Sequence, residues 1–249
     1  MLLAVDIGNT NLTCGIFAGS KLKRQFDLPS KTYKPGQLSQ KIIAHPSISV
    51  CVLCSVVPKL TRLIQIEIKQ STGKLPLIIG KDLIVPIKNL YRIPGQVGQD
   101  RLVNAFAATQ IYGAPLVVID SGTAITFDVI SDRGAYLGGL IFPGMKISLE
   151  ALSEKTALLP RVKLQPPTAL IGRDTKNSIL SGVVLGTAAL TKGLSARIKQ
   201  TLGKSARIIG TGGNISLIKK YSGMKIIINR NLTLNGIKLI FAGVKLKGA

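Results

Sequence analysis

The 249-residue sequence has no tryptophan, a single histidine and three cysteines. His45 stands beside Pro46 in a connecting stretch with no motif around it, so Ser–His and Cys–His nucleophilic catalysis have little support. The odd number of cysteines excludes a framework of paired disulfides. Cys51 and Cys54 form a C-x-x-C pair, but on a predicted strand this spacing puts their side chains on opposite faces. No second pair completes a zinc site, and we expect free buried thiols in a reducing cytosol.

Acidic residues are also scarce. Eleven Asp and Glu stand against 33 Lys and Arg, which gives a formal net charge of +22. Such a charge favours nucleic-acid binding, because cationic surfaces release counterions from phosphates. However, the basic residues form no dense block, and only six Phe and five Tyr are present for base stacking. The sequence therefore favours general attraction of anionic ligands over a nucleic-acid interface.

Long apolar runs are absent too. No uninterrupted apolar stretch reaches the ~18 residues of a membrane-spanning helix. The apolar residues 1–5 lack a basic leader and are interrupted by Asp6, which argues against a secretory signal. Apolar residues nevertheless make up 46% of the chain, enough for a sizeable core. We expect a cytoplasmic protein without membrane association.

One motif occurs twice. An apolar run ends in Asp6-Ile7-Gly8-Asn9-Thr10, and another ends in Asp120-Ser121-Gly122-Thr123. Each copy predicts a strand, a tight turn and a second strand. Such a turn presents backbone N–H groups and a hydroxyl to an anion, and its carboxylate can hold a cation. Two of them facing each other would hold the phosphates of a nucleotide, which predicts phosphoryl transfer.

The residues of these turns suggest individual roles. Gly8 lets the backbone approach a phosphate closely, and Asp6 would hold magnesium, directly or through water. Thr123 would donate to a phosphate oxygen, and Asp120 is a candidate metal ligand. The structural alternative is that Asp and Asn serve only as ordinary turn residues.

Two further segments are candidates. The glycine-rich stretch 209–214 lies between a predicted strand and helix and would contact adenosine. Asp100, in Gly98-Gln99-Asp100-Arg101, precedes a predicted helix, where a carboxylate is stabilised. It could be only a cap, or it could accept the proton of a substrate hydroxyl as the phosphoryl group leaves ATP. Arg101 would then bind an anionic part of the substrate.

The order of predicted elements indicates two related α/β lobes, 1–114 and 115–249, with a nucleotide cleft between them. Each lobe begins with a three-strand meander and continues with alternating helices and strands. The predicted meanders span 2–28 and 116–142, and further strands 48–55, 77–79, 206–210 and 225–228. The predicted helices span 37–44, 59–70, 101–112, 146–152, 178–202, 215–221 and 234–242.

Taken together, these motifs resemble type III pantothenate kinases, a family of the actin-like, Hsp70-like and sugar-kinase-like superfamily. The resemblance extends to the runs 138–144, 156–160 and 172–175 and to Ser181-Gly182, all in the expected order. It implies a duplicated ribonuclease-H-like, or actin-like ATPase, fold. It also implies transfer of the ATP γ-phosphoryl group to the primary hydroxyl of pantothenate, giving 4'-phosphopantothenate, the first step of coenzyme A biosynthesis.

The same resemblance implies site residues and partners. Asp100 would be the base, and Asp120 would bind potassium or ammonium beside the magnesium that accompanies ATP. Family members are homodimers in which Thr175 reaches the partner's site. Pantothenate would contact Tyr91, Gly98, Gln99, Asp100, Arg101 and Thr175. ATP would contact Asp6, Ile7, Gly8, Asn9, Thr10, Asn11, Leu12, Thr13 and Thr123.

Two features depart from the family pattern: the strongly basic composition, and Asn214 where an Asp is common. The first keeps a rival interpretation open, a non-catalytic regulatory homologue that binds nucleic acid or another polyanion. The three carboxylates Asp6, Asp100 and Asp120 weigh against it. A sugar or acetate kinase of the same superfamily would share the phosphate turns but not the segment 98–101.

Overall fold

The structure is a computed structural model that describes residues 1–203 and 205–247. By its internal contacts the chain divides into two compact units. Unit 1 comprises Met1–Lys88, Arg92–Gln110 and the chain from Asn231 onwards, and unit 2 comprises Asn89–Tyr91 and Ile111–Arg230. The division near residue 110 lies close to the predicted lobe boundary, but the last helix groups with unit 1 rather than with the second half of the sequence. Positions 204, 248 and 249 of the predicted second lobe lie outside the described residues.

Unit 1 is built on a five-stranded sheet of order β3-β2-β1-β4-β5. β1 is antiparallel to β2 and parallel to β4, so the predicted meander is confirmed and a parallel crossover follows it. The crossover agrees with the helical sequence between the meander and β4. The strands are β1 (Leu2–Ile7), β2 (Asn11–Ala18), β3 (Lys21–Pro29), β4 (Val50–Ser55) and β5 (Leu77–Ile78).

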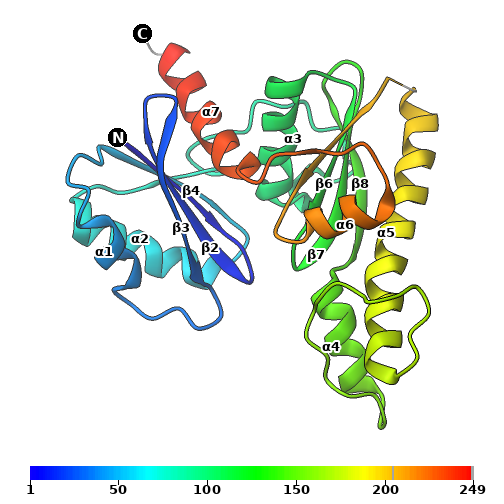
Figure 1. Cartoon of the computed structure of the whole chain (residues 1–249). Helices are drawn as coiled ribbons and strands as arrows, with labels where there is room; N and C mark the ends of the chain where they lie inside the picture. Colours follow the sequence, from blue (N-terminus) through cyan, green and yellow to red (C-terminus); the bar gives the residue numbers. More distant parts are fainter. Residues whose placement is uncertain (204, 248–249) are drawn as a thin grey trace. The chain divides into compact units, whose positions relative to one another are not determined.

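Helices cover this sheet. α1 (Gln37–Ile42) and α2 (Pro58–Thr72) lie beside the sheet of unit 1 (Figure 1). They bury apolar side chains in a common core with β1, β2 and β4. α7 (Leu232–Lys247) packs on β1, β2 and β4, and Gly236 lets it approach Val103 of α3 (Gln99–Tyr112). A short 3-10 helix, η1 (Pro94–Gln96), precedes α3. α3 begins two residues earlier than predicted, so it includes Gln99 and Asp100.

Unit 2 repeats the same plan. Its sheet has the order β10-β9-β6-β7-β8, which is the strand order of unit 1 with each strand replaced by its counterpart. β6 is antiparallel to β7 and parallel to β9, as β1 is to β2 and β4. This equivalence confirms the predicted duplication. The strands are β6 (Leu116–Ser121), β7 (Ala124–Ile130), β8 (Tyr136–Pro143), β9 (Arg207–Thr211) and β10 (Ile227–Ile228).

The helices of unit 2 are α4 (Met145–Lys155), α5 (Thr175–Leu202) and α6 (Ile215–Ser222). α5 packs against α4, α6 and β6 and begins one turn earlier than predicted. It is also long and apolar enough to cross a membrane, although 44% of its most apolar window is buried in the structure. A core helix of a soluble protein meets the same criterion.

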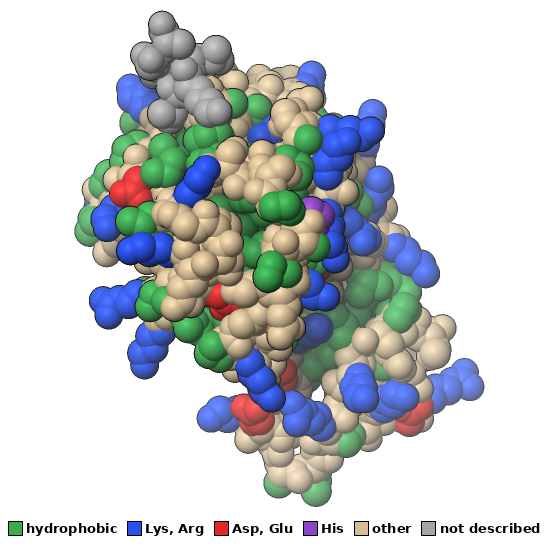
Figure 2. Space-filling model, turned by 90° about the vertical axis from the view of Figure 1, so that its left-hand side faces the viewer, with side chains coloured by type: hydrophobic (Ala, Val, Ile, Leu, Met, Phe, Trp, Pro, Cys, Tyr) green, Lys and Arg blue, Asp and Glu red, His purple; other side chains and the backbone are tan. Residues whose placement is uncertain are grey.

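On the face that Figure 2 shows, Lys and Arg side chains are scattered between apolar and uncharged polar surface. They do not gather into one block on that face. There the arrangement agrees with general attraction of anions.

Candidate active site

The first predicted phosphate turn (residues 6–10) lies where β1 joins β2 in unit 1. The Gly8 N–H donates to the Asn11 carbonyl at 3.0 Å, and a Cβ at Gly8 would stand 3.2 Å from the same oxygen. The Ser30 N–H donates to the Thr10 carbonyl at 2.9 Å, which ties the turn to the end of β3. The turn is therefore a fixed, glycine-dependent loop whose residues 9–11 are exposed to solvent.

Two predicted ATP-binding residues point away from solvent, into the hydrophobic core of unit 1. Ile7 and Leu12 are fully buried in the core of unit 1, so any contact they make with a nucleotide runs through their backbone. Asp6 and Thr13 are paired across β1 and β2. Because side chains alternate along a strand, they lie on the sheet face opposite that core. This alternation separates the polar face of the turn from its apolar support.

Asp6 and Asp100 lie near one buried thiol. Cys54 faces Asp6 across the parallel β1–β4 pair. Burial raises the pKa of the Cys54 thiol well above its usual value, and the charges of Asp6 and Asp100 raise it further. Cys51, by contrast, lies in the core against α1 and α2, so the two cysteines do occupy opposite faces. Within unit 1, then, two of the three predicted carboxylates converge.

Asp100 sits in the first turn of α3. The Arg101 N–H donates to Asp100 Oδ1 at 2.9 Å. Burial raises the pKa of Asp100, and the Arg101 N–H and charge only partly oppose this effect. A carboxylate of raised pKa at a helix N-terminus is suited to accept a proton in catalysis.

Two glycines shape the surroundings of Asp100. A Cβ at Gly98 would stand 2.5 Å from Asp100 Oδ1, so no other residue fits there without movement. Gly80, at φ +89°, receives the Gln99 side chain, because a Cβ at Gly80 would lie 2.7 Å from Gln99 Cδ. Sequence reasoning identified the segment 98–101 but not its support at Gly80, which is distant in the sequence.

The second predicted phosphate turn (residues 120–123) lies where β6 joins β7 in unit 2. The Gly122 N–H donates to the Ala124 carbonyl at 3.0 Å, and the Gly144 N–H donates to the Thr123 carbonyl at 3.1 Å. A Cβ at Gly144 would clash with the carbonyls of Gly122 and Thr123. Gly144 precedes α4, so this helix starts directly against the turn.

The glycine-rich loop after β9 completes this half of the site. Thr211 is paired with Asp120 across the parallel β6–β9 pair, and the Asn214 N–H donates to the Ser121 carbonyl at 3.0 Å. Gly212, at φ +86°, lies directly against the Asp120 carboxylate. Two glycine-rich segments predicted separately from the sequence thus meet around Asp120.

The donor set fits a metal that is shared with a nucleotide. Among the described residues, no group of three His, Cys, Asp or Glu side chains could hold a metal ion alone. Magnesium keeps several waters and takes ligands from substrate phosphates, so a single carboxylate can be sufficient for it. Within unit 1, Asp6 beside the glycine turn at Gly8 is compatible with that requirement.

The predicted pantothenate residues are divided between the two units. Gly98, Gln99, Asp100 and Arg101 belong to unit 1. Tyr91 belongs to unit 2, where its ring packs beside β8. Thr175 also belongs to unit 2 and is exposed as the first residue of α5. The Asp174 carboxylate caps that helix by accepting the Asn177 N–H at 2.8 Å.

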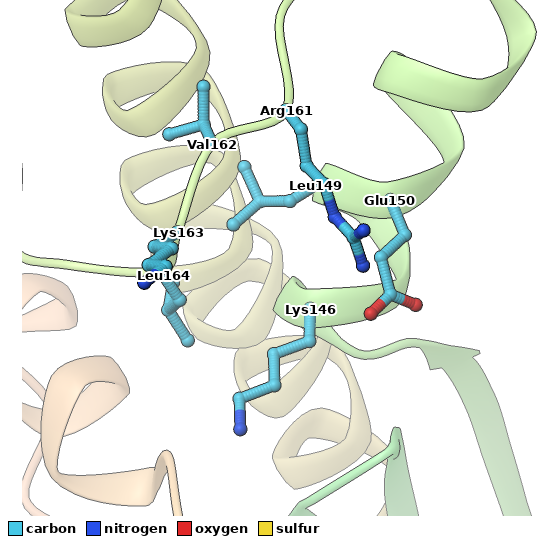
Figure 3. Close-up of a pocket in the computed structure, with 7 residues that line it drawn as sticks. All are labelled: Lys146, Leu149, Glu150, Arg161, Val162, Lys163 and Leu164. Carbon is cyan, nitrogen blue, oxygen red and sulfur yellow. The ribbon is translucent and has the colours of Figure 1, made fainter.

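A separate cavity of about 550 Å³ lies beside α4 and contains none of the predicted site residues. Figure 3 shows the side chains of Arg161 and Glu150 running in the same direction, with their charged ends near each other, and Leu149 beside Arg161. Lys146 and Lys163 also line the cavity. Its lining of apolar side chains and mixed charges does not match the glycine-lined phosphate turns.

Comparison with known proteins identifies the family. Residues 2–197 match the family model of type III pantothenate kinase. A type III pantothenate kinase of Persephonella marina is 41% identical over 97% of this chain and 98% of that protein. The enzyme of the same name from Moorella thermoacetica is 38% identical over 97% of this chain and 98% of its own. The chain belongs to the type III pantothenate kinases.

Solved structures support the fold of this family member. A Campylobacter jejuni protein assigned to the Baf family of transcriptional activators matches with a TM-score of 0.63 and 21% identity, over 98% of this chain and 99% of that one. The 2-hydroxyisocaproyl-CoA dehydratase activator of Clostridium difficile matches with a TM-score of 0.57 and 13% identity, over 99% and 96%. At these identities the likeness shows the fold alone.

Proposed function

We propose that this pantothenate kinase family member transfers the γ-phosphoryl group of ATP to the primary hydroxyl of pantothenate. The product is 4'-phosphopantothenate, so the reaction is the first step of coenzyme A biosynthesis. The assignment of roles depends on the position and the raised pKa of Asp100. This residue is held at the start of α3 with a raised pKa, and it shares the neighbourhood of Cys54 with the phosphate-turn residue Asp6.

In the proposed mechanism, Asp100 accepts the proton of the pantothenate hydroxyl. The hydroxyl oxygen forms a bond to the γ-phosphorus, and the bond from that phosphorus to the bridging oxygen of ADP breaks. Arg101 binds a polar or anionic group of pantothenate and so orients the hydroxyl. The turns at Gly8 and Thr123 would hold the phosphates, and magnesium, which Asp6 would hold, would supply neutralisation of their charge. Phosphoryl transfer depends mainly on such positioning and charge neutralisation.

A monovalent cation is the second part of the proposal. Asp120 would bind potassium or ammonium, and two close glycine approaches support a cation site there. A Cβ at Gly212 would stand 2.4 Å from Asp120 Oδ1, and a Cβ at Gly122 would stand 3.6 Å from it, so the backbone lies close to the carboxylate on both sides. Carboxylate and carbonyl oxygens are suitable ligands for a hard cation.

We further propose a cytoplasmic homodimer with a shared active site. α5 supports it, because Gly182, Gly186, Ala189 and Gly193 recur at helical spacing along an exposed side. A groove runs along this side of α5 and is lined by Ser178, Ser181 and Leu185. The exposed Leu170 and Ile171 border it. Small residues let two helices approach closely, and a dimer formed there would bring the α5 N-terminus, with Thr175, to the partner.

A panel of phosphoryl acceptors tests the proposed function. The purified protein is incubated with ATP, magnesium and either pantothenate, glucose or acetate, with and without potassium, and ADP formation is followed. We expect turnover with pantothenate alone among the three, and stimulation by potassium. Turnover with glucose or acetate but not pantothenate would overturn the proposal. So would the absence of any kinase activity together with tight, strongly salt-dependent DNA binding, which the regulatory alternative predicts.

A further inference from the structure

The carboxylate of Asp128, in β7 of unit 2, is fully buried. The Tyr136 hydroxyl donates to its Oδ1 at 2.9 Å, and the Thr126 hydroxyl donates to its Oδ2 at 3.2 Å. A buried charge is costly unless polar groups surround it. Asp128 therefore stabilises one position of the Tyr136 side chain, which is itself fully buried at the start of β8.

Tyr136 in turn holds the segment that carries Tyr91. The Leu90 N–H donates to the Tyr136 carbonyl at 2.9 Å, and Asn89 forms an isolated parallel bridge with Tyr136. The Tyr91 N–H donates to the Asn89 side-chain oxygen at 3.0 Å. The Tyr91 and Tyr136 rings lie 6.5 Å apart between centroids, tilted by 48°. This is a favourable geometry for an aromatic pair.

The backbone of β8 completes the support. Gly138 has φ +133°, and a Cβ there would stand 3.4 Å from Tyr91 Cδ2. The Tyr91 ring thus rests on a strand position that favours glycine. The segment Asn89–Tyr91 groups with unit 2, although the chain on both sides of it groups with unit 1. Its contacts with β8 account for this assignment.

We propose that Asp128 and Tyr136 are positioning residues that set the affinity for pantothenate through Tyr91. This inference rests on the proposed function, in which Tyr91 contacts pantothenate. The hydrogen bond to Asp128 fixes the Tyr136 ring, and that ring and its backbone carbonyl fix the Tyr91 segment. A binding residue whose support is locked in this way needs no reordering when the substrate arrives.

The test compares KM values for the two substrates. Tyr136→Phe removes only the hydroxyl, and we expect its KM for pantothenate to rise roughly three- to tenfold. This rise should be smaller than the rise in KM caused by removing a residue that contacts pantothenate directly. The KM for ATP should stay unchanged. Asp128→Asn keeps an acceptor oxygen and should remain near wild type, whereas Asp128→Ala should behave like Tyr136→Phe. Gly138→Ala, which crowds the Tyr91 ring without touching this bond, should also raise the KM for pantothenate.

Two controls separate positioning from general loss of stability. Tyr33→Phe removes a similar bond, from the Tyr33 hydroxyl to Glu67 Oε2 at 2.8 Å, in unit 1. It should leave the KM for pantothenate unchanged. Tyr91→Ala tests the underlying assignment and should raise that KM more than Tyr136→Phe does.

Each contrary result has a distinct meaning. If Tyr91→Ala raises the KM for pantothenate but Tyr136→Phe and Gly138→Ala do not, the positioning proposal is wrong and the proposed function stands. Equal changes in both KM values, or the same change in Tyr33→Phe, would reduce Tyr136 to a purely structural residue. An unaffected Tyr91→Ala enzyme would overturn both the Tyr91 contact and this inference. A wild-type protein that does not phosphorylate pantothenate would overturn the proposed function itself.

Discussion

Gly212 lies against the carboxylate of Asp120: a Cβ at position 212 would stand 2.4 Å from Asp120 Oδ1. The backbone at Gly212 also has φ +86°, a conformation that residues other than glycine rarely adopt. The glycine-rich loop after β9 and the second phosphate turn therefore form one arrangement. A change in either should affect the other.

We expect Gly212→Ala to impair the site around Asp120. The added methyl group must displace the carboxylate or the loop, so potassium activation should weaken and turnover should fall at least tenfold. Gly213→Ala is the matched control, because a Cβ there meets no atom within 4 Å. Steady-state assays across potassium concentration check this. Equal behaviour of the two variants would show that the close approach at Gly212 is unimportant.

Asp120→Ala should abolish activation by potassium, because it removes the charge proposed to bind the cation. Asp132→Ala removes an exposed carboxylate from the same unit and should leave the activation intact. The measurement is turnover as a function of potassium concentration at saturating ATP and pantothenate. An Asp120→Ala enzyme with wild-type potassium dependence would remove Asp120 from this role.

The pH dependence follows from the raised pKa of Asp100. The base must be ionised, so kcat should fall with acidification at a higher pH than an exposed aspartate would give. Because the folded pKa lies above the unfolded value, ionisation of Asp100 destabilises the fold. That penalty grows as pH rises through the interval between the two values and is fully present above the folded-state pKa.

Asp100→Asn removes this penalty. Its Tm at pH 7 should therefore exceed that of the wild type, and the difference should shrink on acidification and vanish below the unfolded-state pKa of an aspartate, about 3.9. Thermal unfolding at pH 7 and at about pH 3 checks the sign. A variant less stable than wild type at pH 7 would show that Asp100 stabilises the fold as a capping residue.

Mixed dimers test the shared site. Thr175→Glu places bulk and negative charge against an anionic substrate, while a helix N-terminus tolerates the acidic residue. Homodimers of Thr175→Glu and of Asp100→Asn should both be nearly inactive. Random mixing of subunits should restore about a quarter of wild-type activity, since half of the dimers then carry one intact site. No restoration after confirmed subunit exchange would mean that each site belongs to one subunit.

Much of the fold follows from local sequence signals. Alternating apolar residues and glycine turns predicted both meanders. α2 begins at Pro58 and ends before Gly73, as expected for a helix start and a helix stop signal. The grouping of α7 with unit 1 was not predictable, because it depends on long-range contacts such as Gly236 against Val103. Local periodicity carries no information on which sheet a terminal helix covers.

The site shows the same division. The Asp-Gly-Thr turns were recognisable because they occur twice and need particular residue types. Gly144 was visible only as part of a family motif, and its contact with Thr123 needs the folded chain. In the sequence Asp128 resembles any other residue of a strand, because nothing near it indicates that the Tyr136 hydroxyl donates a hydrogen bond to its carboxylate. Residues that act through a partner on another strand require the structure.

The most direct test of the account compares wild type and Asp100→Asn in ATP-dependent phosphorylation of pantothenate, with binding of both substrates measured by calorimetry. The account predicts that the variant binds ATP and pantothenate as the wild type does but loses turnover by about 10²-fold or more. Near-wild-type turnover in the variant would contradict it.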